Sequence, residues 1–281
     1  MSDSRGGADS GLPTTIDTTV ASEARVYDYW LGGRDNYPAD RALGEEVAAL
    51  IPGIRTMARA NRAFVWRAVR YAIAEQGITQ FLDIGTGIPT ARNTHEVAQE
   101  LDPSARIVYV DKDPVVLAHA RALMGSTPQG RTAYIHADLH DPVSILTDPI
   151  LTGTLDFDRP IALMLISVMI YFRDDEDDPR TIIERLLAAL PPGSLIALSH
   201  PTGDFDPRAM AHVERAAEQA GLTFVARSRA EVETLFAGTD LVEPGVVSVV
   251  DWRPDLLDRP MPGFDPSTDT AWVWAGVGRK P

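Results

Sequence analysis

Short apolar segments alternate with segments of helical spacing from residue 80 to the end of the chain, and this alternation constrains the fold more than any other feature. Strands joined by helices give a mostly parallel sheet with helices on both faces. The sequence therefore predicts a doubly wound α/β fold whose last two strands form an antiparallel edge. The expected strands are residues 80–84, 106–110, 132–136, 161–166, 194–199, 223–226, 246–251 and 271–278, and the expected helices are 90–101, 114–124, 180–189, 207–220 and 229–236.

The chain before this alternation has a different character. Residues 1–21 are rich in Ser, Gly, Asp and Thr without apolar periodicity, which is typical of a disordered arm. Helices are expected at 24–31, 40–50 and 56–76. We expect one domain over 22–281, made of a helical cap or lid (22–78) and a Rossmann-like core (79–281).

Composition narrows the classes of partner and site. The 26 basic and 40 acidic residues give a net charge of -14, which argues against a nucleic acid or a membrane as the main partner. The chain has no cysteine, which excludes disulfides, thiolate metal sites and cysteine nucleophiles. No apolar run is long enough for a bilayer and no secretory signal is present, so a cytoplasmic location is expected. The acidic run at 174–178 lacks the spacing of a calcium loop, and no metal site is expected.

The end of the first expected strand is the first candidate for chemistry. The strand runs into Asp83, and Gly85, Thr86 and Gly87 follow. Two glycines permit a tight turn that a ligand can approach closely, and Asp83 can accept from an ammonium group. A short Gly-x-Gly pattern also occurs in plain strand–helix turns, so this motif alone does not decide.

Two further strands also end in acidic residues. Asp111 lies 24 residues past Gly87, where a carboxylate can hold both hydroxyls of a ribose. Asp138 follows the third strand, where it can accept from the amine of adenine while Leu139 packs on the ring. Asp111 could instead cap a helix, and Asp138 could be an ordinary loop residue. Together, however, the three strand ends predict an adenosine site. Thr90, where dinucleotide folds favour a third glycine or alanine, and the acidic Asp83 favour S-adenosylmethionine over NAD.

Several segments resemble a bacterial S-adenosyl methyltransferase family that was long catalogued as a domain of unknown function. They are 24–37 (ARVYDYWLGGRDNY), 60–64 (ANRAF), 81–90 (FLDIGTGIPT), 93–98 (NTHEVA), 110–111, 252–255 (WRPD) and 276–280 (GVGRK). The resemblance covers about 22–280 and implies the class I methyltransferase fold with a seven-stranded sheet. It also implies S-adenosyl-L-methionine as cofactor, without naming a methyl acceptor. Many relatives carry a histidine where this chain has Met169.

Other residues complete the expected site. Asn36 and Tyr37 are expected in a lid beside Gly32-Gly33, whereas Tyr27 and Trp30 are expected to pack in the core. Arg62 could hold the methionine carboxylate of the cofactor, although a surface arginine is an equal alternative. The expected cofactor-binding residues also include Lys112 and Ser167, near the ends of the second and fourth strands, and the candidate acid–base residue is His200 after the fifth strand.

These observations predict a methyltransferase that transfers a methyl group from S-adenosylmethionine to a small-molecule acceptor. Two alternatives stay open. A non-catalytic S-adenosylmethionine-binding regulator would explain the lack of an obvious base, and an NAD-dependent oxidoreductase would use the same type of fold. The oligomeric state is not predicted.

Overall fold

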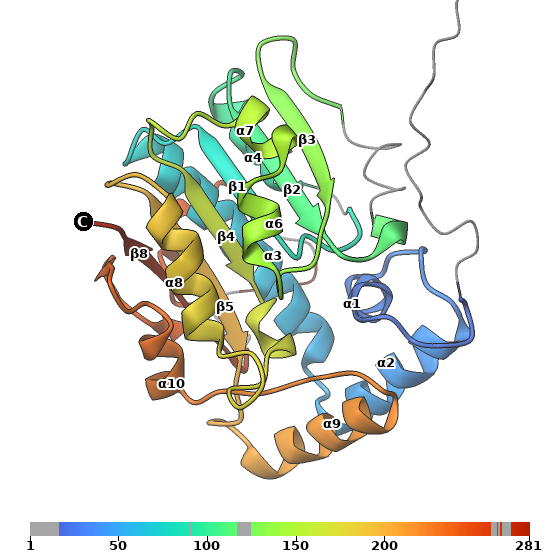
Figure 1. Ribbon diagram of the computed structural model, residues 1–281. Helices are drawn as coiled ribbons and strands as arrows, with labels where there is room; N and C mark the ends of the chain where they lie inside the picture. The colour runs from blue at the N-terminus through green and yellow to red at the C-terminus, as the bar shows by residue number, and fades with distance from the viewer. Residues whose placement is uncertain (1–16, 90–91, 117–124, 260–262, 264, 266–270) are drawn as a thin grey trace, which may run out of the picture.

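The computed structural model describes residues 17–89, 92–116, 125–259, 263, 265 and 271–281 (Figure 1). Its centre is an eight-stranded sheet in the order β3-β2-β1-β4-β5-β8-β6, with β7 paired to β8 outside this path. The pairs from β3 to β5 are parallel, and β8 is antiparallel to β5, β6 and β7. The bounds are β1 Gln80–Ile84, β2 Arg106–Asp111, β3 Arg131–His136, β4 Ala162–Ile166, β5 Leu195–Pro201, β6 Asp240–Leu241, β7 Val247–Ser248 and β8 Val273–Arg279.

Helices cover both faces of the sheet, as the alternation predicted. In Figure 1, α6 (Pro142–Leu146), α7 (Pro149–Thr154) and α8 (Pro179–Ala189) lie in front, and α3 (Ile54–Ala74) and α4 (Thr94–Leu101) lie behind. Strand side chains alternate between two apolar clusters: Phe81 of β1 packs on the α3 side, and Leu82 packs on the α8 side. Both faces of the central strands are therefore buried, which explains their continuous apolar sequences.

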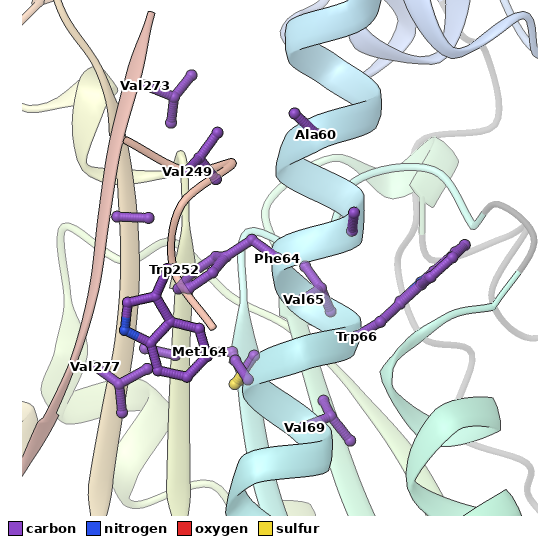
Figure 2. Close-up of a cluster of buried hydrophobic side chains, with 14 of the residues drawn as sticks. Ala60, Phe64, Val65, Trp66, Val69, Met164, Val249, Trp252, Val273 and Val277 are labelled. Carbon is purple, nitrogen blue, oxygen red and sulfur yellow. The ribbon is translucent and has the colours of Figure 1, made fainter. Parts of the chain in front are cut away.

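The α3 side of the core is built around one tryptophan. Trp252 is fully buried, and its ring meets Phe64 edge-on with 5.3 Å between centroids (Figure 2). The buried Arg67 of α3 donates to the backbone oxygens of Val249, Val250 and Trp252 at 2.7, 3.2 and 2.6 Å. These bonds fix the segment after β7 against α3, so the predicted strand 246–251 is reduced to the two residues of β7.

The cap lies at the carboxyl ends of the parallel strands. There α1 (Glu23–Leu31) and α2 (Pro38–Leu50) stand beside α9 (Pro207–Gln219), which packs against α2 (Figure 1). A buried ion pair joins the first two helices, because Arg25 Nε lies 2.9 Å from Asp40 Oδ2 and both side chains are at most 5% exposed. Arg25 also donates to the backbone oxygen of Val20 at 2.5 Å, so the part of the predicted arm that the structure describes is bound to the cap.

Several boundaries differ from the expectation. Residues 223–226 form no strand, because their backbone is bound to separate partners: Val225 donates to Ile170 O and Ala226 to the Glu214 carboxylate, both at 2.9 Å. Helix α4 begins at Thr94, with Arg92 in a left-handed conformation at φ 58°. The helix expected at 114–124 falls mostly outside the described residues. Elements that were not predicted are α6, α7, β6, and the 3-10 turns η1 (Met169–Tyr171) and η2 (Pro254–Leu256), whereas α10 (Arg229–Thr234) was expected.

Candidate active site

The turn after β1 has the conformation that its two glycines allow. Gly85 and Gly87 have φ of +73° and +66°, a region that favours glycine. A Cβ on Gly85 would lie 2.4 Å from Cγ2 of Val168, so the loop after β4 packs directly on this turn. A Cβ on Gly87 would meet nothing within 4 Å. The backbone of Gly87 therefore borders open space, and Gly85, Thr86 and Gly87 all line one large cavity.

Asp111 connects this turn to the end of β2. Its Oδ2 accepts from the backbone N–H of Gly87, and its Oδ1 accepts from that of Asp113, both at 2.9 Å. Burial is the largest influence on this carboxyl and raises its pKa to about 6, although the two N–H donors act in the opposite direction. Both carboxylate oxygens are thus oriented by backbone groups while the residue lines the cavity.

Asp83 is the second buried carboxylate of the cavity. It is 7% exposed, and Thr94 Oγ donates to its Oδ2 at 2.6 Å. Burial raises its pKa to about 6, Thr94 and the charge of Arg62 lower it, and the negative charge of Asp111 raises it further. Ionising both aspartates without a cationic ligand is therefore costly.

Arg62 of α3 supplies positive charge at the same place. Its guanidinium makes only long contacts, at 3.5 Å to Arg92 O and 3.4 Å to Asn93 Oδ1. The Nε of Arg62 is buried without a hydrogen-bond partner in the part of the chain that the structure describes. The side chain lines the cavity, so it has donor capacity available for an anionic group.

The segment after β3 closes the cavity on another side. Asp138 Oδ1 accepts from the backbone N–H of His140 at 3.0 Å and contacts His140 Nδ1 at 2.6 Å. Leu139 is buried beside them, and all three residues line the cavity. Lys112 also lines it, with its Nζ 3.8 Å from Glu23 of α1.

A chain of hydrogen-bonded polar side chains borders the cavity through Tyr27, Asn61 and Ser167. Asn61 Nδ2 donates to Tyr27 OH and to Ser167 Oγ, both at 3.1 Å, and its Oδ1 accepts from Ser199 Oγ at 2.6 Å. Tyr27 OH donates to Ala58 O at 3.1 Å. Ser167 has φ of +52°, a strained value for a serine, in the loop that packs on Gly85. Sequence reasoning missed the role of Tyr27 and Asn61 because their partners come from distant segments.

The half of the cavity away from the acidic residues is apolar. We call it the apolar chamber, and its walls come from α2, α3, α9 and the segment after α9. Its main residues are Leu43, Val47, Met57, Met210, Val213 and Phe224. Trp30 packs against the core cluster, as expected, and it also lines the cavity together with Tyr27 of α1.

Asn36 and Tyr37 do not line the cavity, so the structure does not bring them together with the other expected cofactor-binding residues. Asn36 is buried in its own loop, where its Nδ2 donates to Asp28 Oδ2 at 2.9 Å and to Gly33 O at 3.1 Å. The backbone N–H of Tyr37 donates to Asp40 Oδ2 at 2.7 Å, at the start of α2. Both residues therefore stabilise the loop between α1 and α2, and residues of α1 line the cavity.

His200 is also placed differently from the expectation. It is fully buried and absent from the cavity wall, and its Nε2 lies 2.9 Å from the guanidinium of Arg227. Since arginine only donates, Nε2 accepts, and Nδ1 donates to Pro201 O at 2.8 Å. Burial lowers the pKa of His200 to about 4. Both nitrogens of the neutral ring are occupied, so the geometry gives His200 a structural place and no acid–base role.

Comparisons with known proteins agree on one family. Residues 9–281 match the model of the S-adenosyl methyltransferase family. The chain belongs to this family. A crystal structure of a DUF574 family protein from Streptomyces avermitilis MA-4680 is 45% identical, covers 95% of this chain and 100% of its own, and has a TM-score of 0.88. A candidate methyltransferase from Thermobifida fusca YX is 41% identical over 94% of this chain and 96% of its own, with a TM-score of 0.84.

More distant structures show the shared fold. The plantazolicin methyltransferase BpumL, in complex with a triazolic desmethylPZN analog and SAH, is 13% identical over 92% of this chain and 96% of its own, with a TM-score of 0.53. No curated protein matches the chain. The family confirms the class I Rossmann-like fold and S-adenosylmethionine as the cofactor, and it decides against the NAD alternative.

Met169 lies where the resemblance implied a histidine in many relatives. It is fully buried in η1, does not line the cavity, and accepts from Arg227 through its backbone oxygen at 3.0 Å. A methionine at this position therefore removes no base from the cavity wall.

None of the helices in the described ranges is long and apolar enough to cross a membrane.

Proposed function

We propose that this methyltransferase holds S-adenosylmethionine in the acidic half of the cavity and methylates a small-molecule acceptor in the apolar chamber. Asp111 would hold the ribose hydroxyls, Asp83 the ammonium group and Arg62 the carboxylate of the methionine part. The desolvated carboxylates and the unpartnered Nε of Arg62 support this assignment, since each lacks the charge or hydrogen bond that the cofactor would supply.

Other expected residues fit the same arrangement. Gly85, Thr86 and Gly87 would approach the cofactor with their backbone, and Leu139 and Asp138 would meet the adenine. Lys112 and Ser167 border this half, the latter next to the polar chain of Asn61. When bound, S-adenosylmethionine supplies an electrophilic methyl group on a sulfonium.

The residues of this chain contribute mainly position and exclusion of water. Asn61 holds Ser167 and Tyr27 at the boundary between the two halves, and α1 and α9 enclose the chamber. Displacement at a sulfonium methyl requires above all that the nucleophile be aligned with the methyl group. The observation that carries the proposal is that buried carboxylates and a group of apolar side chains line the same cavity.

Methyl transfer can be tested separately from cofactor binding. The protein is incubated with methyl-labelled S-adenosylmethionine and a bacterial extract divided into small-molecule and macromolecular fractions. We expect label in the small-molecule fraction with the wild-type protein and much less with Asp111→Ala. Cofactor binding without transfer to either fraction would favour the regulator, and label in macromolecules alone would contradict a small-molecule acceptor.

A further inference from the structure

The apolar chamber is enclosed by elements that are far apart in the sequence. Leu43 and Val47 of α2 face the same space as Met57 of α3 and Met210 and Val213 of α9. These side chains are at most 8% exposed, although they border a cavity rather than solid core. Apolar side chains that line a cavity gain packing contacts from an apolar ligand that fills it.

The charged groups of the cavity wall are not among the residues that define this chamber. The acidic and basic lining residues that the structure describes belong to the start of α1, to Arg62, and to the ends of β1, β2 and β3, and His140 also lines the cavity. Within the described part of the chain, the residues that define the chamber carry no carboxylate, ammonium, guanidinium or imidazole group, and the phenol of Tyr27 is a polar group on the same cavity wall. A charged acceptor body would therefore lose its hydration without gaining a counter-ion.

The hydrogen-bonded polar side chains that border the chamber already use their protons in hydrogen bonds to one another or to the backbone. Tyr27 OH donates to Ala58 O, and Asn61 Nδ2 donates to both Tyr27 and Ser167. Ser199 Oγ donates to Asn61 Oδ1, which leaves the Ser167 hydroxyl to donate to Ser199 Oγ, 3.3 Å away. The hydroxyl groups of Tyr27 and Ser167 therefore have free lone pairs but no free proton. They can accept a hydrogen bond from a ligand and cannot donate one.

We infer that the methyl acceptor is an uncharged, largely apolar small molecule that donates one N–H or O–H hydrogen bond to Tyr27 or Ser167. This inference rests on the proposed function, because it places the nucleophilic nitrogen or oxygen beside Ser167, in the loop that packs on Gly85. Donation toward the protein directs the lone pair of the nucleophile away from the polar chain. Methyl transfer then breaks the bond from the methyl carbon to the sulfonium sulfur, forms the bond to the acceptor nitrogen or oxygen, and leaves neutral S-adenosylhomocysteine. The proton of the acceptor is lost to water. The chamber holds the apolar body, and the hydrogen bond sets its orientation.

Binding to the chamber can be measured while the cofactor half is occupied. S-adenosylhomocysteine is first titrated by calorimetry and then kept saturating. The neutral fluorescent probe N-phenyl-1-naphthylamine is added next, and we expect saturable binding with increased emission. Butylbenzene, 4-butylaniline, 4-butylphenol and 4-butylbenzoate then compete, and we expect the aniline or the phenol to bind roughly fivefold more tightly than butylbenzene. The anionic benzoate is expected to compete least.

Two pairs of variants locate the binding. Leu222→Trp fills the chamber and is expected to weaken probe binding roughly tenfold, whereas Leu241→Trp, on the exposed strand β6, leaves it unchanged. If Leu222→Trp does not fold, Phe224→Trp takes its place. Tyr27→Phe is expected to reduce the advantage of the aniline or phenol over butylbenzene, and Tyr29→Phe, whose hydroxyl bonds Glu45 outside the cavity, is expected to retain it.

The outcomes separate this inference from the proposed function. If S-adenosylhomocysteine itself does not bind, the proposed function fails. If it binds but the probe does not, the apolar acceptor is wrong. The inference is also overturned if Leu222→Trp or its substitute binds the probe as the wild type does, if the benzoate competes best, or if neither donor outcompetes butylbenzene.

Discussion

Asp111 accepts the backbone N–H of Gly87 at 2.9 Å, and this bond ties the end of β2 to the turn after β1. The carboxylate is therefore oriented before any ligand arrives, and so is the turn that borders the cavity. Preorganisation of this kind lowers the cost of ordering groups when a ligand binds. Replacing Asp111 removes a candidate ligand contact and loosens the turn, so both effects enter any measurement on that variant.

The affinity for S-adenosylhomocysteine is expected to depend on pH. Burial raises the pKa of Asp83 and of Asp111 to about 6, so these carboxyls are mostly protonated at pH 5 and mostly ionised at pH 7. The ammonium group of the ligand favours the ionised form, and affinity should rise about tenfold from pH 5 to pH 7 for one such carboxyl. Calorimetry across this range checks the slope.

Asp83→Asn should flatten this pH dependence, since Asp83 faces Arg62, Thr94 and Asp111 and is the carboxyl assigned to the ammonium group. His140→Gln provides the control, because His140 is another titratable residue on the cavity wall. A slope that disappears in His140→Gln and persists in Asp83→Asn would contradict the assignment.

The two glycines of the turn should respond differently to alanine. Gly85→Ala would place a Cβ 2.4 Å from Val168, so we expect a large loss of stability, of about 2–4 kcal/mol when overpacking and left-handed strain are combined. A Cβ on Gly87 has free space, so Gly87→Ala should lose only about 1 kcal/mol of stability through conformational strain. Its methyl group would lie on the cavity side of the turn. The free energy of unfolding, measured with urea and by scanning calorimetry, should be lower for Gly85→Ala than for Gly87→Ala. Equal stability of the two variants would count against this packing.

His200→Ala tests whether this histidine is structural. Removing the ring leaves a cavity and takes one hydrogen-bond partner from the buried Arg227, so we expect a loss of about 2–4 kcal/mol. The affinity for S-adenosylhomocysteine at a temperature where the variant is folded should stay within about twofold of the wild type, well inside one tenfold step of affinity. A stable variant with weakened cofactor binding would instead place His200 at the site.

The buried ion pair of the cap should matter more than an exposed one. Asp40→Ala leaves Arg25 buried and uncompensated, which costs about 3–5 kcal/mol and should release α1 from α2. Glu45→Ala breaks the exposed pair with Arg55, which solvent screens, and should cost much less than Asp40→Ala. Hydrogen exchange in α1 together with urea unfolding compares them. Similar losses in both variants would show that the buried pair does not hold the cap.

Local signals made part of this site predictable. The glycine turn and the aspartates at the ends of β1, β2 and β3 follow from short-range sequence, and the parallel topology brings those strand ends together. The face of α1 that meets the cavity depends on the Arg25–Asp40 pair, 15 residues apart, so Tyr27 and Trp30 could not be told from core residues. His200 was misplaced for a similar reason, since Arg227 covers it from a segment 27 residues away.

The most direct test of the account is a calorimetric titration of S-adenosylmethionine, S-adenosylhomocysteine and NAD into the wild-type protein and into Asp111→Ala. We predict that the first two bind the wild type and NAD does not, and that Asp111→Ala weakens binding at least about tenfold, or about 1.4 kcal/mol. Failure of both S-adenosyl ligands to bind, preference for NAD, or unchanged affinity in Asp111→Ala would contradict the proposed site.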